Sequence, residues 1–129
     1  MRVAHVAVWT ADLERLRAFY ERHLGATSGR KYENAAKGFS SYFIDFDGGA
    51  RLELMSKGGI APAPAAPAPE RAGYAHLALS LGSRDAVVAL TDRLHAAGIP
   101  VLDGPRTTGD GYFESVVADP DGNRIELTE

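Results

Sequence analysis

The segment ADPDGNRIELTE, residues 118–129, ends the chain and decides the fold. Its DPDG run (119–122) predicts a tight turn, because proline fixes one central φ angle and glycine accepts a positive one. The RIELTE that follows alternates apolar and polar side chains, which is typical of a β-strand with one buried face. We therefore expect a hairpin whose last strand carries Glu126 on the face opposite Ile125 and Leu127.

An earlier hairpin of the same kind is predicted near the middle of the chain. The runs SYFIDFD (41–47) and RLELM (51–55) are joined through Asp-Gly-Gly at 47–49, which supplies the positive φ angles that a hairpin turn needs. Glu53 occupies the centre of RLELM, as Glu126 occupies the centre of RIEL. The two glutamates are 73 residues apart, so we expect the same unit to occur twice.

The strand and helix that precede each hairpin also repeat. VAHVAVW (3–9) predicts a strand and DLERLRAFYERHLG (12–25) an amphipathic helix, and YAHLALSL (74–81) with SRDAVVALTDRLHAAG (83–98) repeats that order. Asp12 is the expected N-cap of the first helix and Gly25 its stop. A strand is expected after each helix too, although it is only weakly marked in the first copy.

These patterns predict an α+β fold made of two βαβββ modules within one domain of 129 residues. The first module spans 1–57 and the second spans 74–129. Between them, residues 58–73 contain four of the seven prolines and predict an extended, polyproline-like connector.

Composition excludes several classes of function. The net charge of −3, without a basic cluster, argues against nucleic acid as a partner. No apolar segment is long enough for a signal peptide or a spanning helix, so we expect no membrane association and a cytoplasmic location. The absence of cysteine means that any metal ion must be held by His, Asp or Glu.

Four potential ligands oppose apolar rows on their strands: His5, Glu53, His76 and Glu126. If the apolar rows pack against the helices, all four project from the other face of the sheet. Two imidazoles and two carboxylates suit a divalent transition ion and leave positions for water or substrate.

A simpler interpretation stands beside the metal site. A glutamate between leucines is commonly a solvated residue on an open sheet face, and a lone strand histidine is commonly structural. Repetition alone does not make a ligand either. His23 and His95 are 72 residues apart, yet both lie near predicted helix ends, where they favour the helix dipole. Shared strand placement, facing and chemical type together distinguish the proposed quartet.

Three stretches carry a family resemblance: HVAVWTADLERLRAFYERHLG (5–25), YAHLALSL (74–81) and DPDGNRIEL (119–127). With these, nearly the whole chain resembles the vicinal oxygen chelate superfamily, which includes glyoxalase I, bleomycin-resistance proteins and extradiol dioxygenases. The resemblance implies paired βαβββ modules that form a curved mixed sheet around the site, with helices on the convex face. It also implies a small-molecule substrate or ligand and a homodimer.

The ligand order His5, Glu53, His76, Glu126 is similar to that of glyoxalase I. By this resemblance the ion is nickel, cobalt or zinc, with iron or manganese as further options. The implied reaction is isomerisation of a hemithioacetal through a metal-stabilised enediolate, with Glu126 as the base and Glu53 as its near-symmetric partner. The glutathione-dependent enzymes usually carry Arg, Asn and Lys where this chain has Trp9, Lys57 and Arg106, so their glutathione clamp is missing.

Two other functions remain open. One is a protein that sequesters a small molecule such as an antibiotic, as bleomycin-resistance proteins do. The other is a dioxygenase with iron on His5, His76 and Glu126. For any of these, several aromatic residues and one arginine are candidates for contacting the small molecule, with core packing, dimer packing or an exposed loop as the alternative role of each. These candidates are Trp9, Phe39, Tyr42, Tyr74, Arg106 and Tyr112.

Overall fold

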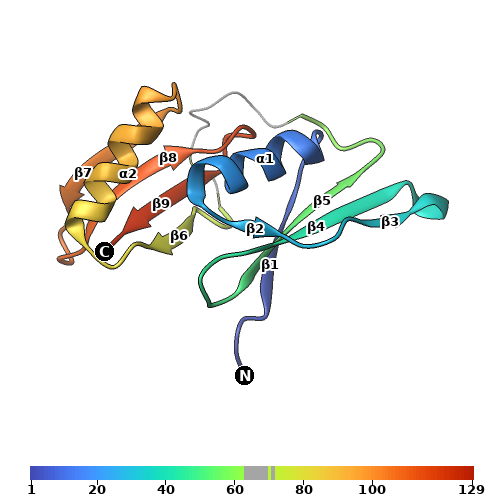
Figure 1. Ribbon diagram of the computed structural model, residues 1–129, viewed down its shortest axis with the longest axis horizontal. Coiled ribbons are helices and arrows are strands. Elements are labelled where there is room, and N and C mark those ends of the chain that lie inside the picture. Colours follow the sequence, from blue (N-terminus) through green and yellow to red (C-terminus); the bar gives the residue numbers. More distant parts are fainter. Residues whose placement is uncertain (63–69, 71) are drawn as a thin grey trace. The chain divides into compact units, whose positions relative to one another are not determined.

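The computed structural model describes residues 1–62, 70 and 72–129 (Figure 1). The chain divides into two compact units, Met1–Ala63 and Pro64–Glu129. Each unit has one long helix packed on a sheet of its own, which confirms the α+β class and the paired modules. Of the predicted connector, residues 63–69 and 71 lie outside the described residues.

The first unit contains a sheet in the order β1-β5-β4-β2, with β3 also paired to β4. Strand β1 runs parallel to β5, and β4 and β5 form the predicted antiparallel hairpin. The weakly marked strand of this copy occurs as two short pieces, β2 and β3. The elements in chain order are β1 (His5–Trp9), α1 (Leu13–Leu24), β2 (Thr27–Ser28), β3 (Tyr32–Asn34), the 3-10 turn η1 (Ala35–Lys37), β4 (Phe39–Asp45) and β5 (Arg51–Lys57).

Helix α1 begins and ends where the sequence predicts. The Asp12 carboxylate accepts a hydrogen bond from the backbone N–H of Arg15, and Gly25 ends the helix with a φ of 69°. Its apolar side, which includes Leu16 and Tyr20, is buried, and the helix contacts β4 and β5. The alternation of β5 therefore directs Leu52 and Leu54 to the core under this helix.

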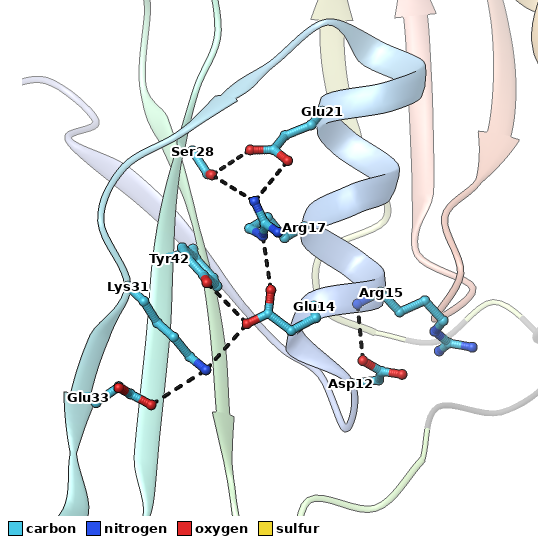
Figure 2. Close-up of polar contacts among 9 residues, drawn as sticks. All are labelled: Asp12, Glu14, Arg15, Arg17, Glu21, Ser28, Lys31, Glu33 and Tyr42. Atoms are coloured by element: carbon cyan, nitrogen blue, oxygen red, sulfur yellow. Dashed lines mark hydrogen bonds and ion pairs between the residues drawn. The ribbon is translucent and has the colours of Figure 1, made fainter.

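A polar network joins α1 to the strands beside it (Figure 2). Glu14 accepts hydrogen bonds from the Tyr42 hydroxyl and from Arg17 Nε, both at 3.1 Å, and lies 3.3 Å from Lys31 Nζ. The Arg17 guanidinium also bonds Glu21 at 3.0 Å. Tyr42 thus extends from β4 toward the helix.

The second unit repeats this arrangement. Its sheet has the order β6-β9-β8-β7, with β6 parallel to β9, and α2 contacts β7, β8 and β9 (Figure 1). Its buried core includes Val87 and Leu94 from the helix and Ile125 and Leu127 from β9. The elements are β6 (Leu77–Ser80), α2 (Arg84–Ala96), β7 (Val101–Thr107), β8 (Phe113–Ala118) and β9 (Arg124–Thr128).

One part of the second unit differs from the prediction. The sequence GPRTTGDGY (104–112) predicts a loop, but β7 continues to Thr107 and pairs with β8. The register shifts between Asp103 and Arg106, and such an irregularity accommodates a glycine and a proline that regular pairing disfavours. The prediction is therefore wrong for 104–107, and the connection to β8 begins at Thr108.

No helix in the described ranges has both the length and the apolar character that crossing a membrane requires.

Candidate functional site

Strand register places a histidine and a glutamate together in the first unit. Parallel pairing sets Ala7 of β1 beside Glu53 of β5, and His5 lies two residues before Ala7. Because Leu52 and Leu54 face the helix, Glu53 faces the open side of the sheet. His5 Nε2 lies 3.7 Å from Glu53 Oε2, and the glutamate side chain is only 16% exposed.

The second unit contains the same relationship. Ala78 of β6 pairs with Glu126 of β9, and His76 lies two residues before Ala78, just ahead of the strand. His76 Nε2 lies 3.3 Å from Glu126 Oε2, and this glutamate side chain is 17% exposed. The repeat seen in the sequence therefore extends to strand register, to the pairing of side chains and to their burial.

The 3.3 Å nitrogen–oxygen separation of the second unit matches two neighbouring ligands of one ion, whereas the 3.7 Å separation of the first unit is longer than that. Both separations are longer than the usual N–H···O hydrogen bond of about 2.7–3.2 Å. Two neighbouring ligands at the usual nitrogen and oxygen distances from a transition ion lie roughly 3–3.5 Å apart. Within the part of the chain that the structure describes, no group of three or more His, Cys, Asp or Glu is placed to hold a metal ion. Each unit thus supplies one His–Glu pair.

The His76–Glu126 pair of the second unit lies in the wall of a hollow of about 630 Å³. His76 and Glu126 line it together with Asp103 and Arg106 of β7. Arg106 Nε donates to Asp103 Oδ2 at 2.8 Å, and this guanidinium holds the pKa of Asp103 below its usual value. Arg106, ion-paired with Asp103, therefore lies in the same hollow as the predicted ligands, and its contact with substrate stays a prediction.

Glu114 is a residue of this hollow that the sequence analysis missed. It lies on β8, where the neighbouring Val116 pairs with Glu126, and Arg106 Nη2 is 3.8 Å from its carboxylate. Burial and the nearby charge of Glu126 raise the pKa of Glu114, and Arg106 partly opposes this. The alternation in FESVVAD (113–119), with Glu114 opposite Ser115 and Val117, was the available signal.

The open face of the first unit carries aromatic rings in place of a second carboxylate. Trp9 of β1 is 44% exposed and contacts Phe39 edge to face, with ring centroids 6.2 Å apart. Tyr32 of β3 is 56% exposed and lies 6.1 Å from Phe39. Lys57 Nζ lies 4.8 Å from the centre of the Trp9 ring. Of these residues, Trp9 and Phe39 are predicted candidates for substrate contact, and Tyr32 is not.

Tyr42 is placed differently from the prediction. It pairs with Leu54 across β4 and β5, and its hydroxyl bonds Glu14 of α1, so it lies on the helix side of the sheet. Tyr42, a predicted candidate for contacting the small molecule, therefore lies on the face of the sheet opposite Glu53. Tyr42 and Phe43 are adjacent aromatic residues that point to opposite faces of β4, so the sequence does not show which of them faces the helix. The register of β4 with β5 does.

The remaining predicted residues lie outside regular strands or at helix ends. Tyr74 precedes β6 and is 98% exposed, and Tyr112 precedes β8 and is 57% exposed. His23 and His95 lie in the last turns of α1 and α2, as their predicted dipole role requires.

Residues 2–127 match the model of the Glyoxalase/Bleomycin resistance protein/Dioxygenase superfamily. The chain belongs to this superfamily. A probable lactoylglutathione lyase of Vibrio cholerae is 30% identical over 132 residues, which cover 99% of this chain and 90% of that protein.

Solved structures of this superfamily resemble the whole chain. The trypanothione-dependent glyoxalase I of Leishmania major has a TM-score of 0.80 at 24% identity, with 100% of this chain and 86% of that chain covered. A glyoxalase family protein from Enterococcus faecalis has a TM-score of 0.76 at 26% identity, covering 98% and 96% of the two chains. The first likeness supports the fold alone.

Proposed function

We propose that this superfamily member is a metal-dependent, glyoxalase-I-like lyase or isomerase that acts on a small oxygenated substrate. The observation that carries the proposal is the His–Glu pair repeated in both units at the same strand register. If Glu53 and Glu126 were only solvated residues on an open sheet, neither would need a histidine beside it. Two His–Glu pairs together would supply the ligands of one ion.

In this proposal the four residues His5, Glu53, His76 and Glu126 hold a single divalent ion. Nickel, cobalt or zinc suits two imidazoles and two carboxylates, and iron or manganese accepts the same donors. The joining of the two pairs into one site, within one chain or across a homodimer, is part of the proposal. When bound, the ion supplies Lewis acidity that polarises the oxygens of the substrate.

The residues of the chain then move the proton. The Glu126 carboxylate takes a proton from the hydroxyl-bearing carbon of the hemithioacetal and returns it to the adjacent carbonyl carbon. The hydroxyl proton passes to the former carbonyl oxygen, so the product is a hydroxy thioester isomeric with the substrate. The partial burial of Glu126 limits competition from water, and Arg106 offers a positive charge within the same hollow. Glu53 has the equivalent position in the first unit and is the second carboxylate available for proton transfer.

Elemental analysis and turnover test the proposal together. The purified protein is stripped with a chelator, reloaded separately with nickel, cobalt, zinc, iron or manganese, and assayed with hemithioacetals of methylglyoxal and several thiols. We expect about one ion for each full set of four ligands and turnover only after reloading. Protein that retains no ion and turns over no hemithioacetal contradicts the proposal.

The alternatives predict different results in the same experiment. The exposed aromatic rings of the first unit favour, as a second candidate, a protein that sequesters a small molecule without metal. That protein retains no ion and shows no turnover. A dioxygenase on His5, His76 and Glu126 retains iron and consumes oxygen.

A further inference from the structure

The open sheet face of the first unit carries a cluster that the ligand pair does not explain. Trp9, Tyr32, Phe39 and Lys57 form this cluster, which we call the aromatic platform. Trp9 pairs with Met55, and Phe39 pairs with Lys57, so the register puts these side chains on the same face as Glu53.

The platform has features of a preformed binding surface. Phe39 contacts Trp9 edge to face and Tyr32 in a tilted arrangement, and these contacts restrain the rings before any ligand arrives. Two of them, Trp9 and Tyr32, nevertheless remain about half exposed. Exposed aromatic rings that gather on one face commonly mark a site of interaction, whereas scattered ones need no explanation.

The charge on this surface indicates what it binds. Lys57 is exposed, and its ammonium group lies against the Trp9 ring, at the edge of the platform. An anion beside the ring satisfies this ammonium, while the rings favour a flat apolar group. An anion without a planar group would contact Lys57 but not the rings, and a cationic group would be repelled by Lys57.

The distance to the ligand pair gives the size of the molecule. Glu53 and Lys57 are four residues apart on β5, which corresponds to roughly 13 Å along a strand. The Trp9 position lies between them, roughly 7 Å from Glu53 by the same rise. Because the Lys57 ammonium lies over the Trp9 ring, a ligand that extends from the pair to the ammonium spans roughly 7 Å or slightly more, with its planar part against the platform beside Trp9.

We propose that the aromatic platform binds the non-reacting part of the substrate, a planar apolar or aromatic group that ends in an anion. This inference rests on the proposed function only in taking Glu53 as the reacting end. It names the substrate class: an aryl or similarly flat anion, with its oxygenated carbons near His5 and Glu53 and its charge at Lys57.

Trp9 allows a direct test, because it is the only tryptophan of the chain and gives a single indole N–H resonance. The ¹⁵N-labelled protein, without added metal, is titrated with 4-phenylbutyrate, with the neutral 4-phenylbutanol and with hexanoate. We expect the indole resonance to shift and saturate with 4-phenylbutyrate at the lowest concentration. An indole resonance that does not move with 4-phenylbutyrate overturns the inference.

Two variants that keep Trp9 separate charge from stacking. Lys57→Gln is expected to weaken the binding of 4-phenylbutyrate about three- to fivefold and to leave the binding of 4-phenylbutanol unchanged. Tyr32→Ala is expected to weaken the binding of both ligands about three- to tenfold. Lys37→Gln and Val88→Ala, which change an exposed lysine outside the platform and an exposed apolar residue of α2, are the controls and should alter neither titration.

The remaining outcomes also decide the matter. If Lys57→Gln weakens the binding of 4-phenylbutyrate and of 4-phenylbutanol equally, the anionic part of the inference is overturned. A Trp9 resonance that shifts with protein concentration, together with a dimer that Tyr32→Ala dissociates, shows that a second copy covers the platform and overturns it entirely. If 4-phenylbutyrate binds but no metal-dependent turnover occurs, the platform is supported and only the proposed function is contradicted. If turnover occurs but 4-phenylbutyrate does not bind, the proposed function is supported and the platform is contradicted.

Discussion

His76 Nε2 lies 3.3 Å from Glu126 Oε2, and each residue reaches this position through the parallel pairing of β6 with β9. The same pairing of β1 with β5 brings His5 to 3.7 Å from Glu53. Two strands that are distant in sequence thus bring one histidine and one glutamate together in each unit. This repetition explains why single substitutions can test the proposed site one half at a time.

Removal of one imidazole should abolish tight metal binding. We expect His76→Ala to lower the affinity for nickel or zinc by more than the 10- to 100-fold that loss of an outer-shell partner costs, because a ligand itself is lost. Calorimetric titration of chelator-stripped protein measures this. His95→Ala, at the end of α2, is the matched control and should bind metal as the unaltered chain does. Unchanged affinity in His76→Ala would show that the ligand set is wrong.

Replacement of the proposed base should reduce turnover without unfolding the protein. Glu126→Gln keeps the shape of the side chain but cannot accept the proton, so kcat should fall about 10²- to 10⁴-fold. Glu53→Gln distinguishes the two carboxylates, and Glu129→Gln at the chain end is a control that should retain activity. Metal content is measured in each variant, because only a loss of kcat in metal-loaded Glu126→Gln supports its role as base.

The Glu14 network should make stability depend on pH. Partial desolvation opposes ionisation of Glu14, but Tyr42, Lys31 and Arg17 outweigh it and lower the pKa of Glu14 below its usual value. A lowered folded-state pKa adds stability above the unfolded value, and this stability is lost as the pH falls through the folded value. Since Glu14 is half exposed, Glu14→Gln should cost no more than about 1 kcal/mol at pH 7.

Urea denaturation at pH 7 and pH 3 measures this difference. The cost of Glu14→Gln should be smaller at pH 3 than at pH 7, because protonation of the wild-type carboxylate as the pH falls through its lowered pKa removes the stabilisation. Asp92→Asn, on the exposed side of α2, provides a comparison that should show little change at either pH. A cost that is equal at both pH values would mean that the charge of Glu14 does not stabilise the fold.

Gly104 should tolerate no side chain. It has a φ of +76°, and a Cβ there would lie 2.6 Å from the Glu114 carbonyl oxygen. Gly98→Ala is the matched control, because Gly98 has a φ of +79° and a Cβ at that position would meet no atom within 4 Å. We expect Gly98→Ala to cost about 1–2 kcal/mol from the backbone alone. Gly104→Ala should cost more and displace β8, which thermal unfolding and the activity of the reloaded protein detect.

Most of the architecture could be predicted because it depends on local patterns. The Asp-Gly-Gly and Asp-Pro-Asp-Gly turns, the helix cap at Asp12 and the stop at Gly25 act within a few residues, and the structure contains each of them. Apolar alternation likewise placed Glu53 and Glu126 opposite buried leucines and isoleucine. These predictions succeed because side-chain direction in a strand follows from residue number alone.

Other features depend on pairing between distant segments. Tyr42 and Phe43 are both aromatic, so only the register of β4 with β5 shows that Tyr42 faces the helix. The composition of 104–107 predicts a loop, but pairing with β8 makes it strand. Glu114 becomes a neighbour of Glu126 only because β8 and β9 pair in the observed register.

The sequence by itself determined the repeated modules and the four candidate ligands, because periodicity, turn residues and residue type are local properties; the family was indicated by resemblance. Only the tertiary structure decided which of these side chains meet: His5 with Glu53, His76 with Glu126, and Arg106 with Asp103. The physical reason is that strand register is set by hydrogen bonds and packing between segments far apart in the chain, and a shift of one residue would turn each side chain to the opposite face.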